Sequence, residues 1–178
     1  MIKLRSEPTD LSKSDAAEMI RKFGFFDGLL NPAGLGFKHK YKAINFGLII
    51  FDETTGLMWQ QSGFKNLIKF EKAEDYIDNL NQVTFVGYSD WRLPTLEEAM
   101  SLMEPVKSNN LYINPVFDNT QYLICTSDLV LDELVLGERL HWGLDFVDGS
   151  CYNSSICNFI STDVRAVRSS QSSPGKNN

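Results

Sequence analysis

The chain has 178 residues, 43% of them hydrophobic and 12% aromatic, which is enough for one domain to bury a core without relying on disulfides. Its formal net charge of -6 disfavours non-specific binding to nucleic acids or anionic membranes, because both need clustered Lys and Arg. The N-terminus lacks the apolar run of a signal peptide, and the longest apolar run, residues 47–51, is too short to span a membrane. We therefore expect a soluble cytoplasmic protein, with a surface or secreted location by another route left open.

The first 40 residues predict a helical extension. Ser12 is a candidate N-cap and Gly24 a candidate C-cap. Apolar residues recur between them at helical spacing: Ala16, Met19, Ile20 and Phe23. A segment of this length cannot bury a core of its own, so we expect residues 1–40 to pack on a domain formed by residues 41–168.

A pair of strands is expected at the start of that domain. Residues 47–51 are continuously apolar, which indicates a central strand, and residues 57–60 return as a second strand. Asp52 and Gly56 favour a turn between them, because Asp can bond the nearby backbone and Gly tolerates a left-handed conformation.

Two helices are predicted next. Residues 71–82 form an amphipathic helix, and residues 96–103 form a second one that begins at a capping box of Thr95 and Glu98. We expect both to pack on the sheet through apolar side chains: Tyr76, Ile77 and Leu80 from the first, and Leu96, Met100 and Met103 from the second.

The remaining chain predicts strands and loops. Strands are expected at residues 122–126 and 141–147, and Asp148-Gly149 signals a hairpin turn. Residues 164–168 are the expected closing strand, paired with residues 48–51. The connections 127–140 and 150–161 are expected to be loops. The tail, residues 169–178, is rich in Ser, Gly, Pro and Asn and is expected to be disordered.

Three segments together resemble one family, the Lcl C-terminal domain family of bacterial proteins, long catalogued as a domain of unknown function. The segments are Asp52-x-x-Thr55-Gly56-Leu57-Met58-Trp59-Gln60, then Gly87-Tyr88-Ser89-Asp90-Trp91-Arg92-Leu93-Pro94-Thr95, and the closing Val164-Arg165-Ala166-Val167-Arg168. The resemblance covers roughly residues 45–170.

This resemblance implies an α+β, C-type-lectin-like fold. Such a fold has two helices packed on a small twisted antiparallel sheet, with its first and last strands lying together; the N-terminal helical extension would be added to it. Some members are thought to be surface adhesins that bind glycans. In the Asp90–Thr95 motif we expect structural roles, with Trp91 and Leu93 in the core, Arg92 paired with a carboxylate or carbonyls, and Thr95 capping a helix.

A non-catalytic binding module is the function that these patterns favour, with a carbohydrate, peptide or protein partner. The expected site lies on the loops before and after the final hairpin, where Tyr, Ser and Asn give contact area and hydrogen bonds at low entropic cost. The candidate ligand-binding residues are Ser127, Asp128, Asp132, Tyr152, Asn153, Ser154 and Asn158. An equally simple interpretation is that these are solvated loop residues. A structural or oligomerising domain of a larger assembly, including a homo-oligomer, is the alternative function.

Metal and cofactor chemistry is not expected. The two histidines, His39 and His141, lie about a hundred residues apart, and the three cysteines lack the paired spacing of a zinc site. Glu104-Pro105-Val106 and Asn114-Pro115-Val116 only approach the triplets of calcium-dependent lectins. No Gly-x-Ser-x-Gly elbow or phosphate-binding Gly-rich motif is present, so no catalytic residue is assigned.

The cysteines leave one enzymatic alternative. Without an export signal, reduced thiols are the default expectation for Cys125, Cys151 and Cys157. Arg92-Leu93-Pro94-Thr95 also resembles a stretch of the formylglycine-generating enzymes, thiol oxidases that need a redox-active cysteine pair. A bridge between Cys151 and Cys157 would favour that reaction, although their spacing does not match.

Overall fold

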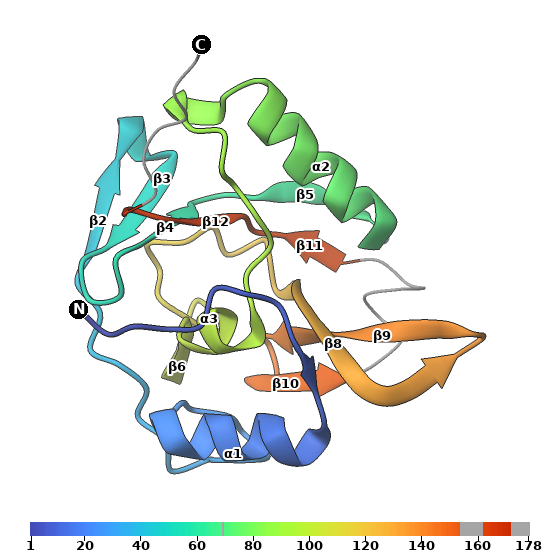
Figure 1. Ribbon diagram of the computed structural model, residues 1–178. Coiled ribbons are helices and arrows are strands. Elements are labelled where there is room, and N and C mark those ends of the chain that lie inside the picture. Colours follow the sequence, from blue (N-terminus) through green and yellow to red (C-terminus); the bar gives the residue numbers. More distant parts are fainter. Residues whose placement is uncertain (69, 154–161, 172–178) are drawn as a thin grey trace.

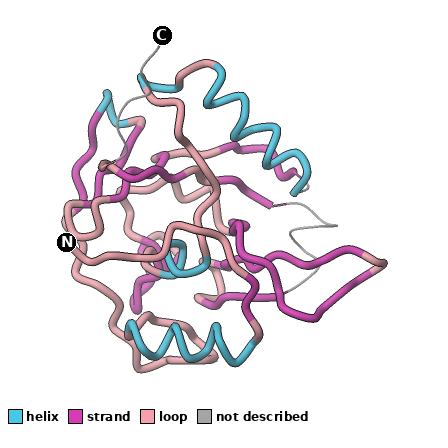
Figure 2. Tube along the Cα trace, viewed as in Figure 1, coloured by secondary structure: helices cyan, strands magenta, loops and turns pink. Residues whose placement is uncertain are grey.

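The computed structural model describes residues 1–68, 70–153 and 162–171, and it is an α+β structure built mainly from strands. Figure 1 shows the long helix α2 lying over β5 and β11, with α1 at the opposite end of the molecule and α3 between them. Figure 2 shows strands and loops in the chain that surrounds these helices. The expected α+β class is confirmed.

A four-stranded sheet carries the predicted hairpin. Its order is β12 (Val167–Ser169), β4 (Leu57–Gln60), β3 (Ile49–Asp52) and β2 (Tyr41–Ile44), all antiparallel. The hairpin β3–β4 is confirmed. The closing strand, however, pairs with β4 rather than with residues 48–51, as Val167 lies opposite Trp59. The predicted pairing is wrong because β2 occupies the other edge of β3.

A second, larger sheet has the order β10 (Ser150–Asn153), β9 (Glu138–Asp145), β8 (Leu123–Val135), β11 (Thr162–Val164) and β5 (Phe64–Ile68). The short β1 (Asp10–Leu11) also pairs with β8. Both β1 and β11 run parallel to β8, so the expectation of a purely antiparallel sheet is wrong. The predicted closing strand is divided at Arg165 and Ala166 into β11 and β12, and it thereby joins the two sheets.

Local sequence signals fix the three helices. They are α1 (Lys13–Phe23), α2 (Phe70–Gln82) and α3 (Leu96–Met100). Ser12 and Thr95 both form complete capping boxes, and Gly24 ends α1 in a left-handed conformation, as predicted. The second predicted helix is shorter than expected, because Met103 already pairs with Ile113 in the small sheet of β6 (Met103–Ser108) and β7 (Leu111–Ile113).

Two buried clusters hold the fold together. In the larger one, Ala16, Ile20 and Phe25 from the N-terminal extension pack with Trp59 and Trp142. The smaller cluster joins α2 to the Asp90–Thr95 motif through Ile77, Leu80, Trp91 and Leu93. The predicted helical phase is confirmed, since Ile77 and Met100 are both buried. None of the described helices is long and apolar enough to cross a membrane.

Candidate functional site

The residues predicted to form a binding loop lie mostly on strands. Ser127, Asp128 and Asp132 belong to β8, and Tyr152 and Asn153 belong to β10. The connection 127–140 is therefore not a loop, since β8 and β9 form a long hairpin across it. Ser154 and Asn158 lie outside the described residues.

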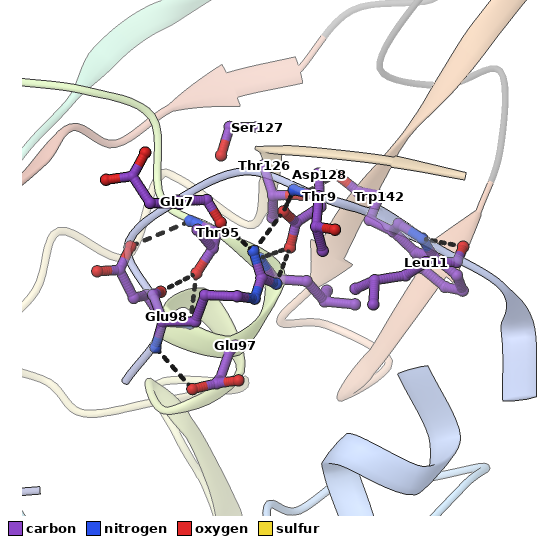
Figure 3. Close-up of polar contacts among 12 residues, drawn as sticks. Glu7, Thr9, Leu11, Thr95, Glu97, Glu98, Thr126, Ser127, Asp128 and Trp142 are labelled. Carbon is purple, nitrogen blue, oxygen red and sulfur yellow. Dashed lines mark hydrogen bonds and ion pairs between the residues drawn. The ribbon is translucent and has the colours of Figure 1, made fainter. Parts of the chain in front are cut away.

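Asp128 is a structural residue. It is fully buried, and its carboxylate accepts hydrogen bonds from the Arg5 guanidinium at 2.6 and 2.9 Å, from the backbone N–H of Thr9 at 2.8 Å and from that of Leu96 at 2.8 Å. Figure 3 shows Asp128 beside Thr9 of the N-terminal segment, with Thr95 and Glu97 along the same segment. Asp128 thus fastens residues 1–11 to the first turn of α3, and it is not available to a ligand.

Tyr152 and Asn153 are also engaged. Tyr152 is half-buried and packs on Gly143, where an added Cβ would lie 2.6 Å from the Tyr152 ring. Burial raises the pKa of the Tyr152 phenol. The Asn153 amide donates to the Glu133 carboxylate at 2.9 Å. Tyr152 is therefore not the exposed aromatic platform that the sequence suggested.

The Asp90–Thr95 motif has the structural roles expected of it. Arg92 donates two hydrogen bonds of 2.6 Å to Glu98, and Arg168 donates to Asp90 at 2.6 and 3.2 Å. The Arg168 guanidinium also lies 3.9 Å from the centre of the Tyr88 ring. The Arg92 contacts join the motif to α3, and the Arg168 contacts fasten it to the closing strand. Trp91 is buried at 2% exposure.

A cleft of about 450 Å³ opens beside this motif. Its lining comes from the N-terminal segment, one face of α2, the motif and β8: Pro8, Glu74, Ile77, Asp78, Arg92, Leu93 and Ser127. Ser127 is thus a predicted site residue that the structure does place at a cleft. Its hydroxyl donates to the Pro94 carbonyl at 3.2 Å.

The walls of the cleft are negatively charged. Glu74 and Asp78 lie one turn apart on α2, so both carboxylates are on the same side of the helix. Both side chains are exposed, and neither forms an ion pair within the described residues. The Arg92 guanidinium is held by Glu98, which largely compensates its charge. A cationic side chain is the group that this wall would attract.

A second groove, of about 330 Å³, lies on the other side of α2. The rings of Phe64 and Tyr76, with centroids 4.9 Å apart, are bordered by Lys72, Asp75 and Asn79. The Gln60 amide donates to the Tyr76 hydroxyl at 2.8 Å. Since that hydroxyl already accepts from Gln60, its own proton can be donated to another group.

A buried histidine–aspartate pair lies under the turn at residues 52–56. His39 contacts the Asp52 carboxylate through Nδ1 and the Ser101 carbonyl through Nε2, both at 2.7 Å. Burial opposes the ionisation of Asp52, but hydrogen bonds from His39 and Thr55 outweigh it and lower the pKa of Asp52. His39 thereby links the N-terminal extension to the first of the three family-like segments.

The cysteines differ from both expectations. Cys151 is a buried free thiol whose pKa is raised, first by burial and then by the neighbouring Asp27 carboxylate. A bridge between Cys151 and Cys157 is therefore wrong. Cys125 is disulfide-bonded, so the expectation that all three thiols are reduced is wrong as well.

Comparison with known proteins agrees with the resemblance seen in the sequence. The family model described as the Lcl C-terminal domain matches residues 48–168, more than half of the chain. No curated protein and no solved structure matches this chain. The match begins just before β3 and ends on β12, so it contains the acidic cleft except for Pro8. The chain belongs to the Lcl C-terminal domain family.

Proposed function

We propose that the protein is a non-catalytic binding module whose partner is another protein, presenting an extended segment with a Lys or Arg side chain. The site is the cleft between α2 and the Arg92–Leu93 segment. The observation that carries the proposal is the pair of exposed carboxylates, Glu74 and Asp78, above an apolar floor that includes Ile77 and Leu93. The apolar floor would accept the aliphatic stem of the basic side chain, and the carboxylates would accept its charge.

The chain's own N-terminus illustrates this kind of recognition on the adjoining surface. The backbone N–H of Arg5 donates to Glu97 at 2.7 Å, and the Arg5 carbonyl accepts from the Thr95 hydroxyl at 2.8 Å. The Arg5 guanidinium meanwhile binds Asp128. An extended segment is thus held through its main chain and one arginine, and Pro8 of the same segment borders the acidic cleft.

We also propose that the scaffold is C-type-lectin-like. In its support, α2 and α3 lie between the first hairpin and the later strands, and β12 closes the sheet that contains β3 and β4. In that arrangement the cleft is bounded by elements the fold holds rigidly, which suits a binding site.

A displayed library of random peptides tests the function directly. Selection against the whole chain should enrich Lys- or Arg-containing peptides, and calorimetry should show binding that weakens as salt rises. Removing both charges by Glu74→Gln and Asp78→Asn should abolish that binding. Asp75→Asn is the matched control, because it removes one charge from the same helix but borders the other groove.

The outcomes separate clearly. Enrichment of peptides without basic residues, or equal binding by the double variant and the wild type, would show that the cleft is not the site. Loss of binding in Asp75→Asn as well would indicate a general charge effect rather than a defined contact.

A neutral sugar is a second candidate ligand, favoured by the groove of Phe64 and Tyr76. Sugars stack their apolar faces on aromatic rings, and Asp75, Asn79 and the Tyr76 hydroxyl offer hydrogen bonds at the rim. A glycan array with wild type and Tyr76→Phe tests this. Binding that Tyr76→Phe weakens and Tyr122→Phe leaves intact would support it, whereas no glycan bound at all would dismiss it.

A further inference from the structure

The side chain of His39 is enclosed just before β2, with 3% of its surface exposed. Its Nδ1 lies 2.7 Å from the Asp52 carboxylate, and its Nε2 lies 2.7 Å from the Ser101 carbonyl oxygen. A neutral imidazole has one N–H and one lone pair, whereas the imidazolium has two N–H groups. Because both ring nitrogens face oxygen acceptors, only the imidazolium satisfies both contacts.

The Asp52 carboxylate is charged and does not supply this second proton. It also accepts hydrogen bonds from the Thr55 hydroxyl and the Thr54 backbone N–H. Burial favours the neutral carboxyl, but the hydrogen bonds from His39 and Thr55 outweigh it and hold the pKa of Asp52 below its ordinary value. The proton that joins the pair is therefore carried by the imidazole ring.

Charged and titratable groups approach the His39 ring from the neighbouring elements. The Tyr41 ring of β2 stacks on it with centroids 4.9 Å apart, and burial keeps that phenol neutral by raising its pKa. Asp52 approaches from β3, while Glu104 of β6 and Arg165 act electrostatically on Tyr41. Two carboxylates against one guanidinium favour a cation at this position. The charged side chains on either side of this junction are exposed to solvent: Lys38, Lys40 and Glu53.

The contacts of His39 join three parts of the chain. His39 belongs to the N-terminal extension, Asp52 begins the first family-like segment, and Ser101 is the C-cap of α3. The backbone N–H of Glu53 donates to the Lys40 carbonyl at 3.0 Å beside this junction. That backbone bond carries no titratable proton, whereas the two bonds of the imidazole depend on its charge.

We propose that His39 is a pH-sensitive switch, which as an imidazolium holds the N-terminal extension to both Asp52 and α3 and which releases α3 when it becomes neutral. The neutral ring keeps its single N–H toward Asp52, because a carboxylate is the stronger acceptor. Its other nitrogen then turns a lone pair to the Ser101 carbonyl, and that contact is lost. The charged ring stabilises the fold, so its contribution is present at low pH and is lost as the pH rises through the release of this proton.

Nitrogen NMR of the ring measures the charge of His39 directly. The chain has two histidines, and burial lowers the pKa of the other, His141, to about 4, which makes it a neutral reference. At about pH 7.5 a histidine in water, with a pKa of about 6.5, is mostly neutral. At that pH His39 should show two protonated ring nitrogens and His141 one, with His141→Gln used to assign the signals. A neutral His39 ring would overturn the proposal.

Hydrogen exchange then tests the release of α3. As the pH rises through the titration of His39, protection of the Glu53 N–H relative to an unstructured peptide should fall about tenfold or more, as expected for one lost hydrogen bond to a charged group. The Phe146 N–H, which bonds the Tyr122 carbonyl at 2.8 Å, should keep its protection. In His39→Gln the protection at Glu53 should be low at every pH.

The wild-type titration decides the question even if His39→Gln does not fold. Constant protection at Glu53 while the ring loses its proton would show that the charge of His39 does not hold the junction. An equal fall at Phe146 would show a global loss of stability in place of a local release. Either result would overturn the proposal.

Discussion

The Arg5 guanidinium and the Asp128 carboxylate form two hydrogen bonds, of 2.9 and 2.6 Å, across 123 positions of the sequence. Asp128 is fully buried and lies inside the family match, whereas Arg5 lies outside it and is partly exposed. The N-terminal extension is therefore joined to the family region by a charge pair as well as by apolar packing.

Arg5→Ala should strongly destabilise the protein. The substitution leaves a buried carboxylate without its cation, which costs about 3 kcal/mol in comparable buried pairs. Urea unfolding of the wild type and the variant measures the loss in the free energy of unfolding. Lys13→Ala is the control, since its ion pair with Glu133 is exposed and should contribute about 0.5 kcal/mol or less. Equal effects of the two substitutions would contradict the buried role of Asp128.

Thr95→Ala should cost about 1–2 kcal/mol of stability. The Thr95 hydroxyl accepts from the Glu98 backbone N–H at 3.2 Å as the cap of α3, and it donates to the Arg5 carbonyl. Thr95→Ser keeps the hydroxyl and should retain most of the stability. Thermal unfolding of both variants checks this, and an unchanged melting temperature for Thr95→Ala would count against the cap.

Asp52 should make the protein acid-sensitive. Its pKa is lower in the folded chain than the ordinary value of 3.8, so its charged form stabilises the fold. That contribution is present above the unfolded pKa and is lost as the pH falls through the folded pKa. The difference in unfolding free energy between wild type and Asp52→Asn should therefore shrink below about pH 4.

Asp163 provides the opposite control. Burial raises the pKa of its carboxyl group, against hydrogen bonds from the backbone N–H groups of Leu123 and Tyr122. Its contribution is present below the unfolded pKa and is lost as the pH rises through the folded pKa. The difference in unfolding free energy between wild type and Asp163→Asn should thus change with pH in the direction opposite to that for Asp52→Asn. A common direction for both residues would contradict the assignment.

Signals within a few residues of each other predict much of this fold. They do not predict which distant segments pair with each other. The caps at Ser12 and Thr95 and the buried faces of α2 and α3 depend on neighbours within a few residues, so the sequence alone indicates them. The β8–β9 ribbon resembles a loop in the sequence because Leu136-Gly137 is not a usual turn pair. A left-handed Asp132 also interrupts the alternation of β8.

The candidate site is harder to predict, for a physical reason. Glu74 and Asp78 follow the pattern of any solvated helix face, and only the tertiary placement of Leu93 and Pro8 turns that face into a cleft wall. Conversely, the sequence predicts a loop position for Asp128, and only the folded structure shows its ion pair with Arg5. Sequence patterns identify residue chemistry, but burial and partners come from the fold.

Gly63→Ala should be severely destabilising. An added Cβ at Gly63 would lie 1.8 Å from the Val164 carbonyl oxygen, a backbone atom that cannot move aside cheaply. The expected cost is about 3 kcal/mol or more, through strain where β5 meets β11. Gly47→Ala should cost only about 1 kcal/mol, because its φ of 83° disfavours a side chain but nothing lies within 4 Å. Urea unfolding of both variants checks the difference, and equal costs would contradict the close approach at Gly63.

The final prediction concerns the closing strand. In β12, Val167 and Arg168 are buried, Val167 exchanges backbone hydrogen bonds with Arg92 at 3.0 and 2.9 Å, and Arg168 binds Asp90. Truncation after Val164 removes all of these contacts, together with the pairing of β12 and β4. The Asp90–Thr95 motif would then lose the strand that fastens it, so we expect the shortened chain to lose cooperative thermal unfolding.

Truncation after Gln171 is the matched control, because it leaves β12 and the bond from the Ser170 N–H to the Gly56 carbonyl in place. That chain should unfold at the wild-type temperature. Circular dichroism during heating distinguishes the two. A cooperative transition in the chain that ends at Val164 would mean that the sheet of β2, β3 and β4 holds the motif without its closing strand, and that Arg168 does not fasten it.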